Sequence, residues 1–243
     1  RSIFVEESIS QVRFALFISM VLVIAVIYFF LSSSSATFIP AITIPVSIIS
    51  TFYIIYLFGF SLNVLTFLAL VLAIGLIVDD SIVVLENIKR RIENGEEPYQ
   101  ASIIGAKQIT FVVIATTLVL VSVFLPLSFM DGKTGRLFIE FGVVLSFAVI
   151  FSSIVALTLT PMLCSKLLKS ESSQDHEPSM LKKFRIFYRN SLTISQREPK
   201  KVYMFSIAMI LLATLLFQFI QKELAPTEDR GIFIISVNGP EGS

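Results

Sequence analysis

The stretch LAIGLIVDDSIVVLEN at residues 72–87 decides the fold, because it places Asp79 and Asp80 side by side within an apolar segment. Mostly apolar residues precede the two acids from position 64, and the apolar pattern resumes at position 82. A helix of about 20 predominantly apolar residues is long enough to cross the hydrocarbon core of a bilayer. The sequence therefore predicts a membrane-spanning helix over residues 62–88 that carries both carboxyl groups.

Two acids inside a membrane need a functional reason. An ionised Asp at the bilayer centre costs about 2.5–3.5 kcal/mol on insertion scales. Neighbouring helix positions point about 100° apart, so Asp79 and Asp80 can reach a shared cation or proton. Burial and a like charge alongside both disfavour the ionised form, so we expect the pair to take up and release protons in coupled steps. The alternative is that the helix ends earlier and the acids lie at the water interface.

Two further polar residues follow the acids on the same helix. Glu86 lies seven residues after Asp79, and Asn87 lies seven residues after Asp80. Seven residues are about two helical turns, so each shares a face with its acid. Glu86 and Asn87 either line a path for protons or mark the interfacial end of the span beside Lys89.

The composition is that of a membrane protein. The chain has 243 residues, of which 55% are hydrophobic and 15% are charged, whereas soluble domains contain about 25% charged residues. A net charge of +1 does not provide the strong positive charge typical of a protein that binds nucleic acid. Cys164 is the single cysteine and His176 the single histidine, so we predict no internal disulfide and no metal site. We also predict no cofactor and no catalytic residue.

Five other segments have the length and composition of membrane spans, which predicts an all-α polytopic bundle of six helices. They cover residues 14–31, 36–58, 103–127, 137–163 and 202–220, with a polar loop, DGKTGR, at residues 131–136. The expected organisation is a first membrane region over 1–163, a cytoplasmic linker over 164–201, a last span over 202–221 and an external domain beginning at 222–243. Because the first residue is Arg1, we interpret the chain as an internal part of a larger protein.

The linker and the C-terminal segment carry their own patterns. Leu181, Phe184, Tyr188 and Leu192 recur at helical spacing, with Lys and Arg on the other faces. This pattern predicts an amphipathic helix on an anionic membrane surface, and a solvated loop is the alternative. Residues 231–238 are rich in β-branched and aromatic residues, which predicts a strand that opens a water-exposed domain.

Loop charges set the expected orientation. An even number of spans leaves both ends on one side, and most Lys and Arg residues fall in the loops of the other side. The side richer in these residues should be cytoplasmic. Both termini are then expected to face outward.

Smaller polar residues and a glycine suit packing roles. Ser61, Asn63 and Thr66 are expected to cap or pack the start of the acid-bearing span. Gly75 is expected to be a close-packing position. Hydroxyl residues within the fourth and fifth spans suit hydrogen bonds between helices, and we assign them no role in transport: Thr116, Thr117, Ser122, Ser146, Ser152, Ser153, Thr158 and Thr160.

Four stretches together resemble the resistance-nodulation-division transporters, and the hydrophobe/amphiphile multidrug efflux pumps of Gram-negative inner membranes in particular. They are LAIGLIVDDSIVVLENI at 72–88, FLPLSFMDGKTGR at 124–136, LTPMLCS at 159–165 and ELAPTEDRGIFIISV at 223–237. The resemblance covers nearly the whole chain. It implies that the chain corresponds to the second through seventh of twelve spans, followed by the start of a periplasmic α+β porter domain.

The resemblance also implies a function. In that family the paired aspartates, here Asp79 and Asp80, translocate protons, and their Lys, Arg and Thr partners come from the other half of the protomer. This implies proton-driven efflux of hydrophobic or amphiphilic compounds by a homotrimer with a periplasmic adaptor and an outer-membrane channel. The alternatives are a metal-ion exporter, a lipid- or protein-export relative, or an inactive membrane fragment. An intramembrane aspartyl protease would need its acids on separate helices, and these are neighbours on one helix.

Overall fold

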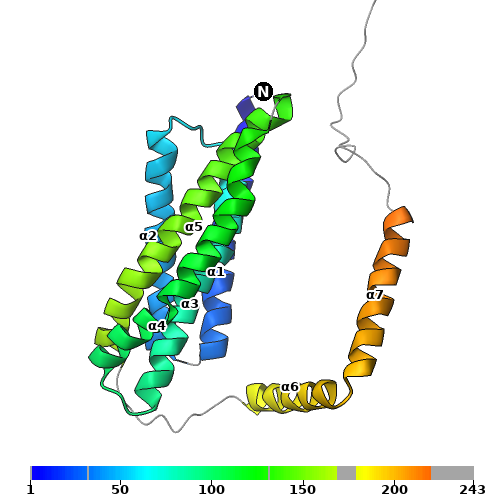
Figure 1. Cartoon of the computed structure of the whole chain (residues 1–243). Coiled ribbons are helices and arrows are strands. Elements are labelled where there is room, and N and C mark those ends of the chain that lie inside the picture. The colour runs from blue at the N-terminus through cyan, green and yellow to red at the C-terminus, as the bar shows by residue number, and fades with distance from the viewer. Residues whose placement is uncertain (1, 32, 131, 169–178, 220–243) are drawn as a thin grey trace, which may run out of the picture. The chain divides into compact units, whose positions relative to one another are not determined.

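The computed structural model describes residues 2–31, 33–130, 132–168 and 179–219, and this part of the chain is helical with short connections (Figure 1). Six of the described helices are long and apolar enough to cross a membrane, which confirms the predicted all-α polytopic architecture. In chain order the elements are α1 (Ser2–Leu31), α2 (Ser34–Leu57), α3 (Val64–Glu93), α4 (Pro98–Phe124), the short 3₁₀ helix η1 (Leu125–Phe129), α5 (Gly132–Leu167), α6 (Ser179–Arg197) and α7 (Pro199–Phe219).

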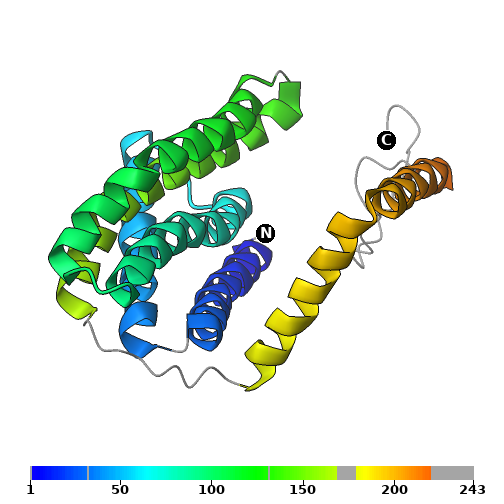
Figure 2. The same ribbon diagram turned by 60° about the horizontal axis from the view of Figure 1, so that its bottom comes forward.

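The acid-bearing helix α3 is central to the bundle formed by α1 to α5. It packs against α1, α2, α4 and α5 (Figures 1 and 2). Leu70, Ile74 and Ile77 of α3 are buried together with Val144 and Leu145 of α5. Close packing of these large aliphatic side chains therefore holds α3 in one rotational setting about its axis, because van der Waals packing stabilises the contacts between helices within a membrane.

One face of α3 remains exposed along the whole helix. The exposed residues of α3 recur at intervals of three or four, so that they form a single stripe, which we call the open stripe: Val64, Leu68, Leu72, Gly75, Asp79, Val83, Glu86, Arg90 and Glu93. Every other face of α3 lies against a neighbouring helix or at the boundary of one. The open stripe decides which polar side chains of α3 remain accessible.

The start of α3 is fixed by a capping box. Asn63 Oδ1 accepts hydrogen bonds from the backbone N–H groups of Leu65 at 2.9 Å and Thr66 at 3.0 Å, and the Asn63 N–H donates to Thr66 Oγ1 at 2.9 Å. Asn63 Nδ2 also donates to Glu140 Oε2 of α5. The predicted capping role of Asn63 and Thr66 is confirmed, and the same asparagine joins the N-terminal parts of α3 and α5.

The end of α3 lies beyond the predicted boundary at residue 88. The helix continues to Glu93, with Arg90 and Arg91 in its last turn. Cations there interact favourably with the negative end of the helix dipole. The chain then reverses at Gly95, which has φ +94°, a conformation that costs a glycine little. The polar loop is correspondingly short, because Pro98 already begins α4.

The prediction of a loop at residues 131–136 is wrong for residues 132–136, which are helical. The structure places the start of α5 at Gly132, only a short distance after η1 ends at Phe129. Glycine makes this tight junction possible, since a Cβ on Gly135 would lie 1.8 Å from the carbonyl oxygen of Met130. The polarity of DGKTGR suggested a loop, whereas Gly132 adopts a positive φ of +88° and Gly135 allows the close backbone approach at the start of the helix.

The helices α6 and α7 belong mainly to a second unit, residues 182–243, described here by itself. The helix predicted in the linker is confirmed as α6, and the exposed Phe184, Tyr188 and Leu192 lie on it. The sixth predicted span corresponds to α7. The strand expected at residues 231–238 and the external domain expected at 222–243 lie outside the described residues.

We expect the Asn63→Ala substitution to lower the free energy of unfolding by about 1 kcal/mol or more, because α3 loses its cap. Chemical unfolding of the purified protein in detergent measures this loss. Asn63→Ser is the matched control, because a serine hydroxyl can still cap the helix while the bond to Glu140 is removed. Equal losses in the two variants would contradict a stabilising role for the cap.

Candidate functional site

Three consecutive residues near the middle of α3 point in three directions. Asp79 lies on the open stripe, Asp80 is half-buried toward α5, and Ser81 is buried. Ser81 Oγ hydrogen-bonds Thr43 Oγ1 of α2 at 3.0 Å. Successive helix positions rotate by about 100°, so adjacent side chains meet different surroundings. The two acids are neighbours in sequence but not in environment.

Asp80 is held by two serines of α5. Ser152 Oγ donates to Asp80 Oδ2 at 3.2 Å, and Ser153 Oγ donates to the same oxygen at 3.0 Å. Ser152 Oγ also lies 3.0 Å from the carbonyl oxygen of Ile77, and Ser153 Oγ hydrogen-bonds Thr117 Oγ1 of α4. A chain of polar groups therefore crosses from α3 through α5 to α4.

The expectation that hydroxyl residues join these helices is confirmed for Thr117, Ser152 and Ser153. Sequence reasoning missed that both serines contact Asp80. The available signal was the adjacent pair of small polar residues in the middle of the fifth span, which matches the adjacent acids in the third. Thr116 and Ser122 of α4, by contrast, donate only to carbonyls of their own helix within the described part of the chain.

Asp79 has different surroundings. Its side chain is exposed on the open stripe and makes no hydrogen bond to a described residue. Glu86 lies on the same stripe, two turns further along α3, as the spacing predicted. Asp79 and Glu86 are thus free of the hydrogen bonds that hold Asp80.

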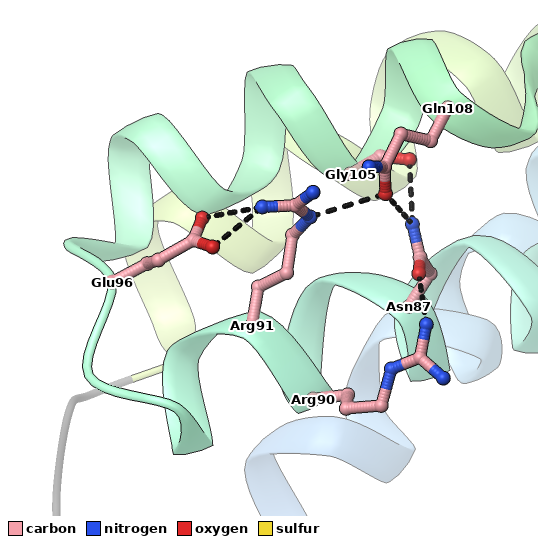
Figure 3. A network of polar contacts seen from close by, with 6 residues as sticks. All are labelled: Asn87, Arg90, Arg91, Glu96, Gly105 and Gln108. Atoms are coloured by element: carbon pink, nitrogen blue, oxygen red, sulfur yellow. Dashed lines mark hydrogen bonds and ion pairs between the residues drawn. The ribbon is translucent and has the colours of Figure 1, made fainter.

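Asn87 is the centre of a polar network between α3 and α4 (Figure 3). Its side chain is buried, with 9% exposed. Asn87 Nδ2 donates to the carbonyl oxygen of Gly105 at 2.9 Å and to Gln108 Oε1 at 3.3 Å, while Asn87 Oδ1 accepts from Arg90 Nη2 at 2.9 Å. These bonds use both the donor and the acceptor of the amide. Of the pair Glu86 and Asn87, only Glu86 therefore keeps its polar atoms accessible.

The same network extends to the loop between the two helices (Figure 3). Arg91 Nε donates to Gln108 Oε1 at 3.2 Å, and Arg91 Nη1 donates to Glu96 Oε2 at 2.8 Å. Gly105 allows this close approach, because a Cβ there would lie 2.9 Å from Ile88 Cγ1. The C-terminal end of α3 and the N-terminal part of α4 are therefore fastened by both polar bonds and backbone packing.

The close-packing role expected for Gly75 is wrong for the described part of the chain. A Cβ on Gly75 would meet no atom within 4 Å. Gly75 instead lines an apolar cavity of about 270 Å³ between α1 and α3. Sequence alone could not separate Gly75 from Gly105, since both are glycines within apolar helices.

No group of three or more metal-ligating side chains comes together among the described residues. Cys164 is a free, buried thiol, and His176 lies outside the described part. The site is therefore composed of carboxyl, hydroxyl and amide groups. Such groups can hold and exchange protons and can form hydrogen bonds.

These features define a multi-pass helical membrane protein with an acid pair on its central helix. The chain belongs to the AcrB/AcrD/AcrF family, which matches residues 1–243, and this confirms the predicted membership of the resistance-nodulation-division transporters. It is 41% identical over 244 residues to an uncharacterized transporter of Haemophilus influenzae, covering 99% of this chain and 24% of the relative. It is 43% identical over 236 residues to the multidrug resistance protein MdtC of Pectobacterium atrosepticum, covering 95% of this chain and 23% of that protein. The chain thus spans about a quarter of the length of these curated relatives.

We expect Asn87→Ala to lower the free energy of unfolding by about 1–3 kcal/mol, because the buried carbonyl oxygen of Gly105 on α4 loses its donor. Chemical unfolding of the purified protein measures the change. Lys107→Ala on the exposed side of α4 is the control and should have little effect. If both variants are as stable as the parent protein, the network does not fasten α3 to α4.

Proposed function

We propose that this chain supplies the proton-carrying part of an efflux transporter in the bacterial inner membrane, which exchanges protons for hydrophobic or amphiphilic compounds. The observation that carries the proposal is the half-buried carboxyl of Asp80, bonded to two serines beside the exposed carboxyl of Asp79. The name of the MdtC relative, a multidrug resistance protein, supports the substrate class.

The position of the acids along α3 supports a location within the hydrocarbon. Asp79 lies 15 residues from Val64 and 14 residues from Glu93, the two ends of the helix. At about 1.5 Å per residue, each end is about 21–23 Å away. Half the hydrocarbon core is about 15 Å thick. If the helix is centred in the bilayer, both carboxyl groups lie inside this layer, remote from bulk water.

The two acids suit different parts of a proton cycle. On the open stripe, Asp79 can pair with a cationic side chain from outside this chain, as the family resemblance implies. No Lys or Arg of this sequence lies in the middle of a span. Protonation would neutralise the acid pair, weaken its attraction to such a cation and allow the helices to shift. That shift would drive the rearrangement of substrate-binding domains outside the membrane.

The energy available is sufficient for such a cycle. Moving one charge across 100 mV provides about 2.3 kcal/mol. Each unit of pH difference adds about 1.4 kcal/mol. Both quantities are of the order of the interactions that a helix shift must break and remake.

Glu86 is the better candidate for a path to the inner side. It lies on the open stripe with Asp79, about 10 Å along the helix. Asn87 was predicted to share this role, but its amide is occupied by Gly105, Gln108 and Arg90. We therefore assign Asn87 to holding α4 in place and Glu86 to proton transfer.

The surroundings of the membrane helices follow from the same proposal. The amphipathic α6, with Phe184 and Tyr188 exposed, would lie on the anionic inner surface of the membrane. Residues 164–201 would then form a cytoplasmic linker, and residues 222–243 would begin the periplasmic porter domain. The homotrimer, the adaptor and the outer-membrane channel are proposed on the family relationship.

We expect Asp79→Asn and Asp80→Asn each to reduce proton-coupled efflux by about 100-fold or more in the complete transporter, the scale typical of losing a proton-transfer group. The assay follows efflux of a lipophilic dye from proteoliposomes under an imposed pH gradient. Glu93→Gln is the control, because Glu93 lies on the same helix and pairs with Lys89.

Undiminished efflux in both Asn variants would overturn the proton-carrying role. Transport of divalent metal ions instead of dyes would favour the metal-exporting relatives. Failure of the unsubstituted transporter to move either class under any gradient would favour an inactive membrane component.

A further inference from the structure

The two serines on Asp80 each have at least two acceptors within reach but only one hydrogen to donate. Ser152 Oγ lies 3.2 Å from Asp80 Oδ2 and 3.0 Å from the carbonyl oxygen of Ile77. Ser153 Oγ lies 3.0 Å from Asp80 Oδ2 and 3.1 Å from the carbonyl oxygen of Val149. A hydroxyl donates one hydrogen bond at a time. Each serine can therefore donate either to the carboxyl or to a backbone carbonyl, and Ser153 can also donate to Thr117 Oγ1.

We propose that Ser152 and Ser153 form a two-position hydrogen-bond switch, which satisfies the Asp80 carboxyl group in both its ionised and its protonated state. This inference rests on the proposed role of Asp80 as a proton carrier. The two serines are positioning residues, because they act through Asp80.

In the ionised state both serine hydrogens point to Asp80 Oδ2, which accepts two hydrogen bonds. When a proton arrives from water and binds Oδ2, that oxygen becomes a donor and can no longer accept both serines. The serine hydrogens then rotate to the carbonyls of Ile77 and Val149, and the new carboxyl O–H donates to Ser153 Oγ. One O–H bond forms at Asp80, and no other covalent bond changes.

Burial makes the alternative acceptors necessary. Ser152 is 1% exposed and Ser153 is 6% exposed, so neither hydroxyl can turn to water when Asp80 is protonated. A buried hydroxyl without a partner is costly, so each state needs its own acceptor. Both serines have one in a carbonyl at about 3 Å. Asp80 can therefore gain or lose a proton without leaving either serine hydroxyl unsatisfied.

Thr117 extends the switch to α4. Its hydroxyl lies against Ser153 Oγ and 2.6 Å from the carbonyl oxygen of Val113. While Ser153 donates to Asp80, Thr117 can donate to Ser153 and so join α4 to α5. When the carboxyl O–H donates to Ser153 instead, the Thr117 hydrogen can return to its own helix. The charge of Asp80 is thereby linked to the contact between α4 and α5.

Few other ionisable groups lie near Asp80 and could influence its protonation. Asp79 is the charged neighbour that acts on Asp80 among the described residues. Most of the other ionisable residues on the helices packed against α3 lie toward helix ends: Glu6, Glu7 and Tyr28 on α1, Tyr53 and Tyr56 on α2, Tyr99 on α4, and Lys133, Arg136, Glu140, Cys164 and Lys166 on α5. Arg13 of α1 and Lys107 of α4 lie further inside their helices.

The test titrates Asp80 directly in the complete transporter. Infrared difference spectra report the carboxyl C=O band as a function of pH, and the band that is lost in Asp80→Asn belongs to Asp80. In the double variant Ser152→Ala/Ser153→Ala, the ionised state loses both donors. We expect the titration midpoint to move to higher pH by about one unit, and the pH profile of dye efflux to move with it.

Matched variants control for packing. Ser146→Ala removes a hydroxyl of similar burial from the same helix, where it donates to the carbonyl of Gly142, and should leave the midpoint unchanged. Thr117→Val should cause a smaller shift in the same direction. Thr116→Val should cause none, because Thr116 bonds only its own helix among the described residues.

The outcomes separate the inference from the proposed function. An unshifted Asp80 midpoint in the serine variants overturns the switch. If the double variant does not fold, Ser152→Ala and Ser153→Ala are titrated separately, and unshifted midpoints in both overturn it equally. If the midpoint shifts but Asp80→Asn still transports normally, the switch stands and the proton-carrying function fails.

Discussion

A carboxyl group in an apolar helix bundle must keep hydrogen-bonding partners, and the contact of Asp80 with two serines meets this requirement. A carboxyl left without partners would be costly in either protonation state. The contact also requires α5 to pass α3 at one depth and in one rotational setting. The buried aliphatic residues of both helices, such as Ile77 and Leu145, provide that setting. The packing of the bundle and the chemistry of Asp80 are thus parts of one arrangement.

The two faces of α3 carry polar residues with different surroundings. Toward the bundle, Asp80, Ser81 and Asn87 each reach a different helix and make specific hydrogen bonds there. Away from it, Asp79 and Glu86 remain on the open stripe without such bonds. One face keeps the helix in place, while the other keeps two acids accessible. A single helix can in this way be both firmly anchored and chemically active.

The sequence was sufficient for the features that depend on local chemistry. Hydropathy predicted the six spans, the spacing of Asp79 and Glu86 predicted a shared face, and Asn63 was recognised as a cap. The sequence was insufficient for the features that depend on which helices contact one another. The partners of Asp80, the network around Asn87 and the contrast between Gly75 and Gly105 all arise from contacts between segments distant in sequence. The start of α5 also depended on a contact, that between Gly135 and Met130.

The open stripe of α3 has a period that limits the geometry of whatever covers it. Its members recur every eleven residues, as in Val64, Gly75 and Glu86, and again in Leu68, Asp79 and Arg90. Eleven residues in three turns correspond to about 3.67 residues per turn, slightly more than the 3.6 of a straight α-helix. The stripe therefore drifts slowly around the axis in the right-handed sense. A helix that followed it from end to end would coil about α3 with right-handed supertwist, opposite to the left-handed winding of a heptad-based coiled coil.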